Sequence, residues 1–196
     1  MRKIPIGISG RHVHLSKEHL EILFGKDYAL TVFKELSQPG QYACEEKVDL
    51  ISPKGLELAG VRILGPVRKA TQVEITQSDA IRYKFTAPIR DSGDISGSGA
   101  CTIKGPKGQV QIGEGVILAD RHIHFSLEDA AEFGVKDGDR VSLKIEGEKS
   151  GLLDGLLCRV SPNFRLDCHL DTDEGAAFLL KTGDSGTLVK KYLIVE

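Results

Sequence analysis

The sequence contains two nearly identical phrases, and each carries a pair of histidines. They are Arg11–Ser16 (RHVHLS) and Arg121–Ser126 (RHIHFS), and together they hold four of the six histidines in the chain. In an extended strand the side chains at positions i and i+2 project from the same face, so each phrase presents two imidazoles side by side. Neutral imidazole is the commonest protein ligand for zinc. Two such pairs therefore predict two metal positions.

A second repeat suggests a third ligand for each pair. Residues 65–80 (GPVRKATQVEITQSDA) align with residues 160–174 (VSPNFRLDCHLDTDE), which places Glu74 opposite His169. Three protein ligands with an open fourth position are typical of catalytic rather than structural zinc. The alternatives are a solvated Glu74 carboxylate and half-buried imidazoles that hydrogen-bond to the backbone. The repetition favours two metal sites, and their expected ligands are His12, His14, Glu74, His122, His124 and His169.

Other polar residues near these phrases could bind an anion. Arg68 precedes Glu74, and its guanidinium could hold a phosphate with two hydrogen bonds, although such an arginine is most often a surface charge. Asp91–Gly99 (DSGDISGSG) is either a mobile hairpin or a loop whose amides and hydroxyls contact phosphate. It is not a Walker loop, because no Gly-Lys-Ser/Thr follows it. We expect His19 to be solvated and outside the site.

The four cysteines give no signal for disulfides or zinc. They show neither CxxC spacing nor a framework pattern, and they predict reduced, buried thiols in a cytosolic protein. Nothing in the sequence argues for a catalytic cysteine. These residues are Cys44, Cys101, Cys158 and Cys168.

Short elements must position the candidate ligands. Each histidine pair runs into a predicted helix that begins at a serine and ends at a glycine, Ser16–Gly25 and Ser126–Gly134. With 22 glycines and no long helical periodicity, the chain is predicted to be mainly β. We expect two small β-barrels related by internal duplication and capped by short α-helices, not a doubly wound α/β sheet. Strands are predicted within residues 48–55, 100–108, 116–119, 140–145 and 192–195.

Composition limits the class of partner. The chain has 196 residues, of which 40% are hydrophobic, so it can bury a core as one domain or two small ones. Its 26 basic and 28 acidic residues give a net charge of −2, which indicates no nucleic-acid partner and no anionic membrane. No apolar run approaches the length that crosses a bilayer, and there is no signal-peptide apolar region. A cytoplasmic location is expected.

Several motifs in order resemble those of the phosphate propanoyltransferases, the propanediol-utilisation type of phosphotransacylase. They are residues 6–16, 36–41 (LSQPGQ), 65–74, 87–94 (APIRDSGD) and 121–124. The resemblance spans nearly the whole chain. It implies a reversible reaction in which an acyl-CoA and inorganic phosphate give an acyl phosphate and free CoA. The acyl-CoA would be propanoyl-CoA or acetyl-CoA.

The resemblance also implies roles for the site residues. One zinc ion would be held by His12, His14 and Glu74, with its open position for the CoA sulfur. A second would be held by His122, His124 and His169, with a position for water or phosphate. Catalytic roles fall to Arg68, which matches the phosphate-binding arginine, and to Ser92 beside the metals. Contacts to CoA are implied for Ser9, Arg62 and Leu64.

The family further implies a layout in which the chain crosses between barrels. One barrel would comprise residues 11–24 and 46–118, the other residues 1–10 and 119–196, with residues 25–45 as a connecting segment. Microcompartment members often carry an amphipathic helix ahead of the first strand. Here only Met1, Arg2 and Lys3 precede it, which favours a cytosolic role. The resemblance is compatible with a homodimer.

Two other function classes fit the same residues. A two-metal hydrolase of ester, amide or phosphoester bonds could use identical ligands. A zinc-stabilised β-barrel binding module would have no turnover. Imidazole also suits cobalt, iron and nickel, so the physiological metal stays open, as do the acyl-chain preference and the direction of flux.

Overall fold

The computed structural model describes residues 2–189, and this part of the chain forms two compact units. Unit 1 takes its described residues from Met1–Ser9, Ser37–Pro39 and Asp120–Glu196, and unit 2 comprises Gly10–Leu36 and Gly40–Ala119. The strand predicted at residues 192–195 lies outside the described residues.

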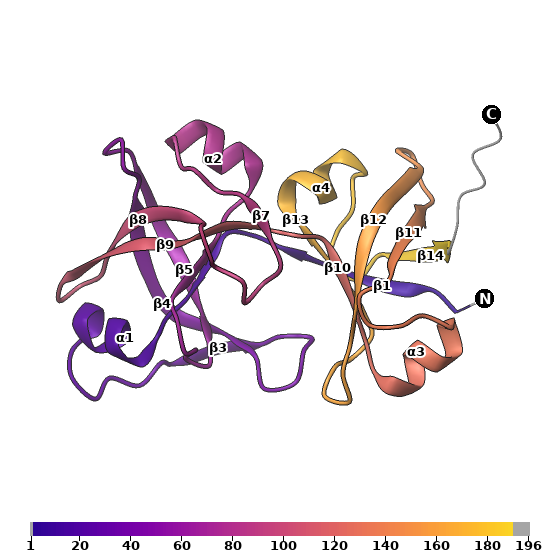
Figure 1. Ribbon diagram of the computed structural model, residues 1–196, viewed down its shortest axis with the longest axis horizontal. Helices are drawn as coiled ribbons and strands as arrows, with labels where there is room; N and C mark the ends of the chain where they lie inside the picture. The colour runs from indigo at the N-terminus through magenta and orange to yellow at the C-terminus, as the bar shows by residue number, and fades with distance from the viewer. Residues whose placement is uncertain (1, 190–196) are drawn as a thin grey trace. The chain divides into compact units, whose positions relative to one another are not determined.

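Unit 1 contains a closed six-stranded barrel (Figure 1). Around the ring the strands are β1 (Ile4–Ser9), β13 (Asp167–Asp171), β10 (His122–Phe125), β12 (Gly151–Val160), β11 (Arg140–Ile145) and β14 (Ser185–Val189). In Figure 1 the indigo β1 lies among orange and yellow strands, and it pairs in parallel with β13. The N-terminal strand therefore completes a barrel whose other strands come from the C-terminal half.

Unit 2 contains a second ring of six strands. In ring order they are β2 (His12–His14), β6 (Gln72–Glu74), β9 (Gln109–Ala119), β8 (Gly99–Lys104), β4 (Tyr42–Ile51) and β5 (Glu57–Gly65). Outside the ring, β3 (Val32–Glu35) pairs with β4, and β7 (Ile89–Arg90) pairs with β9.

The two rings have the same sequence of parallel and antiparallel pairs. β2 is parallel to β5 and antiparallel to β6, just as β10 is parallel to β12 and antiparallel to β13. β6 is parallel to β9 as β13 is parallel to β1. The other three pairs of each ring are antiparallel. The predicted fold, two small β-barrels related by duplication, is confirmed.

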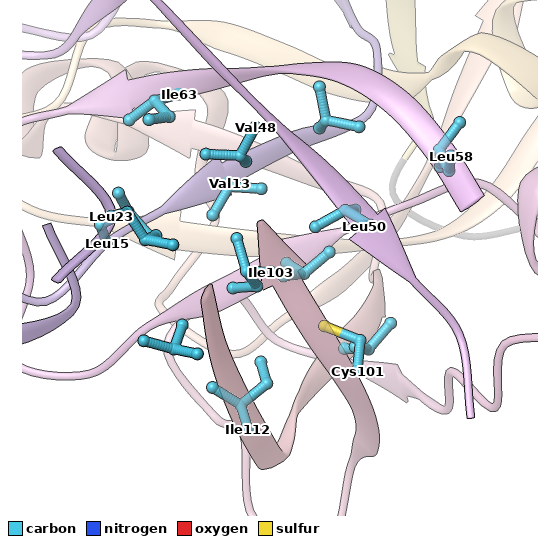
Figure 2. Packing of buried hydrophobic residues seen from close by; sticks show 14 of the residues in the cluster. Val13, Leu15, Leu23, Val48, Leu50, Leu58, Ile63, Cys101, Ile103 and Ile112 are labelled. Carbon is cyan, nitrogen blue, oxygen red and sulfur yellow. The ribbon is translucent and has the colours of Figure 1, made fainter. Parts of the chain in front are cut away.

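The residue between the two histidines of each pair anchors its strand to a core. Val13 and Ile123 are fully buried in the hydrophobic clusters of unit 2 and unit 1. Figure 2 shows Val13 among Val48, Ile63 and Ile103 of the unit 2 core. Because side chains alternate along a strand, the flanking histidines project from the other face of the sheet. Core packing thus determines the direction in which the imidazoles point.

Four short helices follow the strands that carry the candidate ligands. α1 (Lys17–Phe24) and α3 (Leu127–Phe133) begin after N-caps Ser16 and Ser126 and end at Gly25 and Gly134, as predicted. α2 (Gln77–Tyr83) and α4 (Thr172–Ala177) were not predicted. Their signals are present, because an N-cap side chain lies three residues before an acidic residue in each. No described helix has the length and apolar character needed to cross a membrane.

Candidate metal centres

The first cluster of candidate ligands lies in unit 2, where β2 pairs with β6. The antiparallel register places His12 opposite Glu74. His12 Nε2 lies 3.3 Å from Glu74 Oε2, and His14 Nε2 lies 3.9 Å from Oε1. The three residues offer ligand atoms that all lie within 4.8 Å of one another. The fold therefore places Glu74, the third ligand expected from the sequence alignment, beside its histidine pair.

Backbone carbonyls orient both imidazoles of this cluster. His12 Nδ1 lies 2.9 Å from the Gly10 carbonyl oxygen, and His14 Nδ1 lies 3.2 Å from the Leu64 carbonyl oxygen. A carbonyl oxygen only accepts, so in the neutral ring each Nδ1 carries the hydrogen and Nε2 keeps its lone pair. Metal-binding histidines typically donate their second nitrogen in this way.

The second cluster lies in unit 1 and has the same register. β10 pairs with β13 so that His122 lies opposite His169. His122 Nε2 and His124 Nε2 are 3.1 Å apart, and His122 Nδ1 lies 2.8 Å from the Asp120 carbonyl oxygen. With His169, the ligand atoms again lie within 4.8 Å of one another. Among the described residues, only His124 Nδ1 is a buried side-chain polar atom without a hydrogen-bond partner.

Electrostatics favour a neutral His14 and an ionised Glu74 in the unit 2 cluster, and a neutral His124 in the unit 1 cluster. Burial, with the charges of His12 and Arg68, lowers the pKa of His14 to about 3. Burial, with the charges of His122 and His169, lowers the pKa of His124 to about 2. Burial also acts to raise the pKa of Glu74 and to lower that of His12. Their mutual attraction outweighs burial, so the pKa of Glu74 falls well below its usual range and that of His12 rises.

These observations fit metal binding. The donors are imidazole nitrogen and carboxylate oxygen, the set that zinc prefers in catalytic sites. The four rings of the two histidine pairs are buried. Three of them hold a backbone carbonyl through Nδ1, and the fourth, His124, has an unpartnered Nδ1. Each cluster offers three candidate ligands, which would leave a coordination position for substrate or water on a four-coordinate metal.

Arg68 and Ser92, the predicted catalytic residues, lie beside the unit 2 cluster. Arg68 Nη1 donates to Ser92 Oγ at 3.2 Å, and Ser92 Oγ donates to Glu74 Oε1 at 2.8 Å. The charge of Arg68 contributes to the low pKa of His14. The glycine-rich segment after β7 is tied down here, because Gly93 N donates to Gln72 Oε1 at 2.8 Å. The loop thus contacts the candidate ligand Glu74 through the Ser92 hydroxyl and the neighbouring Gln72 through the Gly93 amide.

The residues expected to contact CoA lie in different surroundings. Arg62 donates to the Cys44 carbonyl, and its guanidinium lies 4.5 Å from the centre of the Phe33 ring. Leu64 serves the unit 2 cluster through its carbonyl, which accepts from His14. Ser9 is the last residue of β1 in unit 1 and is half-buried.

Two expectations outside the clusters can be compared with the structure. His19 belongs to neither cluster, but it is not simply solvated, because its Nδ1 lies 2.8 Å from Thr71 Oγ1. The expectation of buried, unpaired thiols is confirmed. Burial raises the pKa of each thiol, to about 11 for Cys44 and about 12 for Cys101 and Cys158, and well above its usual value for Cys168.

Three polar residues at the clusters were not singled out from sequence. Gln72 and Asp167 occupy equivalent positions, two residues before the third ligand, and both are buried. Ser37 reaches Asp167 from the short segment Ser37–Pro39. The available signal was the repeated i, i+2 spacing, since Gln72 precedes Glu74 as Asp167 precedes His169 on one strand face.

Fold and clusters together define a class of protein with two β-barrels related by duplication, each carrying a cluster of three residues that could hold a metal ion. The sequence profile of the phosphate propanoyltransferase family matches residues 5–181. A phosphate propanoyltransferase of Thermotoga maritima is 50% identical over 188 residues, which cover 94% of this chain and 89% of the relative. Those of Lachnoclostridium phytofermentans and Priestia megaterium are 46% and 48% identical, covering 95% and 94% of this chain and 87% and 85% of the relatives.

This chain belongs to the phosphate propanoyltransferase family, and it is an acyltransferase. The family membership expected from the motifs is confirmed.

Proposed function

We propose that the protein interconverts an acyl-CoA and inorganic phosphate with an acyl phosphate and free CoA, with one metal ion bound by each cluster. The observation that carries the proposal is the repeated register, in which each histidine pair lies opposite a third ligand. The names of the relatives support propanoyl-CoA and phosphate as substrates. Zinc is the metal that the donor set fits best.

The reaction is an acyl transfer without redox change. A phosphate oxygen attacks the thioester carbonyl carbon, the new C–O bond forms, and the C–S bond breaks to release CoA. Phosphate is already anionic at neutral pH, so the protein has little need for a strong general base. Zinc, when bound, supplies Lewis-acid stabilisation and lowers the pKa of a coordinated thiol.

The chain's own residues would position the reactants. Arg68 is proposed to hold phosphate with its guanidinium, because its Nη1 reaches the cluster through Ser92. Ser92 is proposed to keep that guanidinium and Glu74 in a common orientation. Orienting two bound reactants in this way can lower the barrier by about 7–11 kcal/mol in favourable systems. Contacts of Ser9, Arg62 and Leu64 with CoA are proposed from the family resemblance.

The test follows thiol release from propanoyl-CoA with and without phosphate, and traps the acyl phosphate with hydroxylamine. We expect release only when phosphate is present, with one acyl phosphate formed for each thiol. Equal release without phosphate would instead identify a hydrolase. Absence of release under both conditions, from folded and metal-loaded protein, would identify a binding module.

Ligand variants connect this activity to the clusters. Substituting His12→Ala or His122→Ala removes a ligand, and we expect turnover to fall by more than the roughly 10–100-fold typical of changes one shell further out. The matched control is His19→Gln, since His19 is the one histidine outside both clusters. A similar loss in all three variants would contradict the assignment.

A further inference from the structure

The residue two positions before the third ligand has a matched role in the two units. In unit 1, His169 Nε2 lies 3.1 Å from Asp167 Oδ2, and in unit 2 Gln72 Nε2 donates to Glu74 Oε1 at 2.6 Å. Asp167 lies opposite His124 as Gln72 lies opposite His14. Both side chains are buried, with 6% and 1% of their surface exposed. Equivalent positions on the equivalent strands β6 and β13 thus contact the third ligand in both barrels.

The polarity of each contact suits the ligand that it supports. An imidazole N–H needs an acceptor, and the carboxylate of Asp167 can only accept. A carboxylate ligand needs a donor, and the amide of Gln72 donates. Exchanging the two would set a carboxylate against Glu74 and would remove the negative charge behind His169. The two side chains are therefore complementary to their ligands and not interchangeable.

A serine from a loop outside the strand pair holds each of these side chains. Ser37 Oγ donates to Asp167 Oδ2 at 2.5 Å, and Gln72 Nε2 donates to Ser92 Oγ at 3.0 Å. Gln38 fixes the loop that carries Ser37, because its amide hydrogen-bonds both the carbonyl and the N–H of Arg165. Gly7 leaves room for Asp167, since a Cβ at Gly7 would lie 3.1 Å from Asp167 Oδ2.

We propose that Asp167 and Gln72 are positioning residues that set the orientation and basicity of the third metal ligand in their clusters. The bond to Asp167 uses Nε2 of His169 and directs Nδ1 to the metal. Each metal site then has one carboxylate. In unit 2 it is Glu74, which would bind the metal directly, and in unit 1 it is Asp167, which hydrogen-bonds to the candidate ligand His169. Outer carboxylates of this kind typically change metal affinity by about 10–100-fold. This inference rests on the proposed metal sites.

The test measures metal binding by the full-length protein without using its activity. In a His12→Ala background only the unit 1 cluster keeps its three ligands, so Zn²⁺ affinity is measured there by competition with a chromophoric chelator. We expect Asp167→Ala to weaken Zn²⁺ binding by about 10–100-fold and Asp167→Asn, which keeps an acceptor, to weaken it less. The Co²⁺ absorption spectrum should shift in both, because ligand orientation changes.

The control is Asp154→Asn, which alters an exposed carboxylate of the same unit that accepts a hydrogen bond from Ser142. It should leave affinity and spectrum unchanged. If Asp167→Ala does not fold, the Zn²⁺ affinities of Asp167→Asn and Ser37→Ala test the proposal instead. We expect Ser37→Ala to weaken Zn²⁺ binding by a few-fold. In a His122→Ala background, Gln72→Leu should weaken the unit 2 cluster in the same manner.

Two outcomes would overturn the inference, and they are distinguishable. Zn²⁺ binding by the His12→Ala protein with unchanged affinity and spectrum in every folded Asp167 variant would refute the positioning role and leave the metal site intact. Failure of both folded backgrounds and of the wild type to bind Zn²⁺ or Co²⁺ would refute the metal sites as well.

Discussion

At the residue scale, each candidate histidine ligand has two ring nitrogens, and a hydrogen bond from one nitrogen to the protein leaves the other available for a metal. His12, His14 and His122 turn Nδ1 toward a backbone carbonyl. In the neutral ring these contacts select the tautomer whose Nε2 has a lone pair. Arg68 adds a positive charge of the kind that an anionic substrate would need, and Ser92 connects it to Glu74.

Substituting Arg68→Ala should separate substrate binding from metal binding. We expect kcat to fall by about 10²–10³-fold, as when a fixed donor to developing charge is removed, and KM for phosphate to rise. Metal content should not change, because Arg68 is not a ligand. Arg68→Lys should recover part of the loss, since it keeps the charge but not the two-pronged geometry.

The control for this variant is Arg82→Ala, which removes an exposed arginine on α2 of the same unit. Kinetic constants of that variant should stay at wild-type values. Loss of metal from Arg68→Ala would contradict the role assigned to Arg68.

At the element scale, the duplication extends from the ligands to the helices beside them. Arg11, before the first histidine pair, lies 2.5 Å from Asp79, and Arg121, before the second, lies 3.4 Å from Glu174. Asp79 and Glu174 occupy the third position of α2 and α4. In each barrel an ion pair therefore connects the strand with two ligands to the helix that follows the third ligand.

Close packing between elements should make one glycine of unit 2 hard to replace. A Cβ at Gly99, in β8, would overlap the backbone carbonyl oxygen of Thr86. Because backbone cannot move aside as a side-chain end can, we expect Gly99→Ala to lower the free energy of unfolding by about 3 kcal/mol. Urea denaturation measures this change.

Gly113→Ala is the matched control in the neighbouring strand β9. Gly113 is exposed, and a Cβ there would meet nothing within 4 Å, so its effect should stay within about 0.5 kcal/mol. Equal destabilisation by both substitutions would show that the contact with Thr86 is unimportant.

At the scale of the whole molecule, the chain builds one three-ligand cluster on each of two separate hydrophobic cores. Within residues 2–189, the three candidate ligands of each cluster belong to a single unit. Ligands on paired strands are brought together only in the folded state, so metal binding should stabilise the native protein.

Chelation should therefore lower thermal stability. At free Zn²⁺ about 100 times Kd, one site contributes about 2.7 kcal/mol, which for a chain of this size corresponds to roughly 5–10 °C in Tm. Differential scanning fluorimetry with and without chelator measures the shift, and metal analysis should give two ions for the wild type and one for His12→Ala or His122→Ala. An unchanged Tm after verified metal removal would exclude stabilisation by the ions.

The sequence alone determined the fold class and the six candidate ligands, because duplication is visible as repeated letters. Alignment of the two halves was sufficient to pair Glu74 with His169 as equivalent third ligands. The strand register that places Glu74 opposite His12 and His169 opposite His122 came from the structure, because alternation along a strand fixes the face of a side chain but not its partner strand. Helices α1 and α3 were predictable because a serine begins and a glycine ends each of them. α2 and α4 end at Lys84 and Phe178, so no glycine marks their C-terminal ends in the sequence.

Only the tertiary structure decided which residues support the ligands. Ser37 lies 130 positions from Asp167 in the chain, and nothing in either local sequence indicates that they meet. The sequence also does not indicate that the Gly10 and Leu64 carbonyls accept hydrogen bonds from His12 and His14. Every residue has a carbonyl, and only the folded backbone selects these two. Local pattern identifies ligands, but the hydrogen bonds that orient them depend on long-range packing.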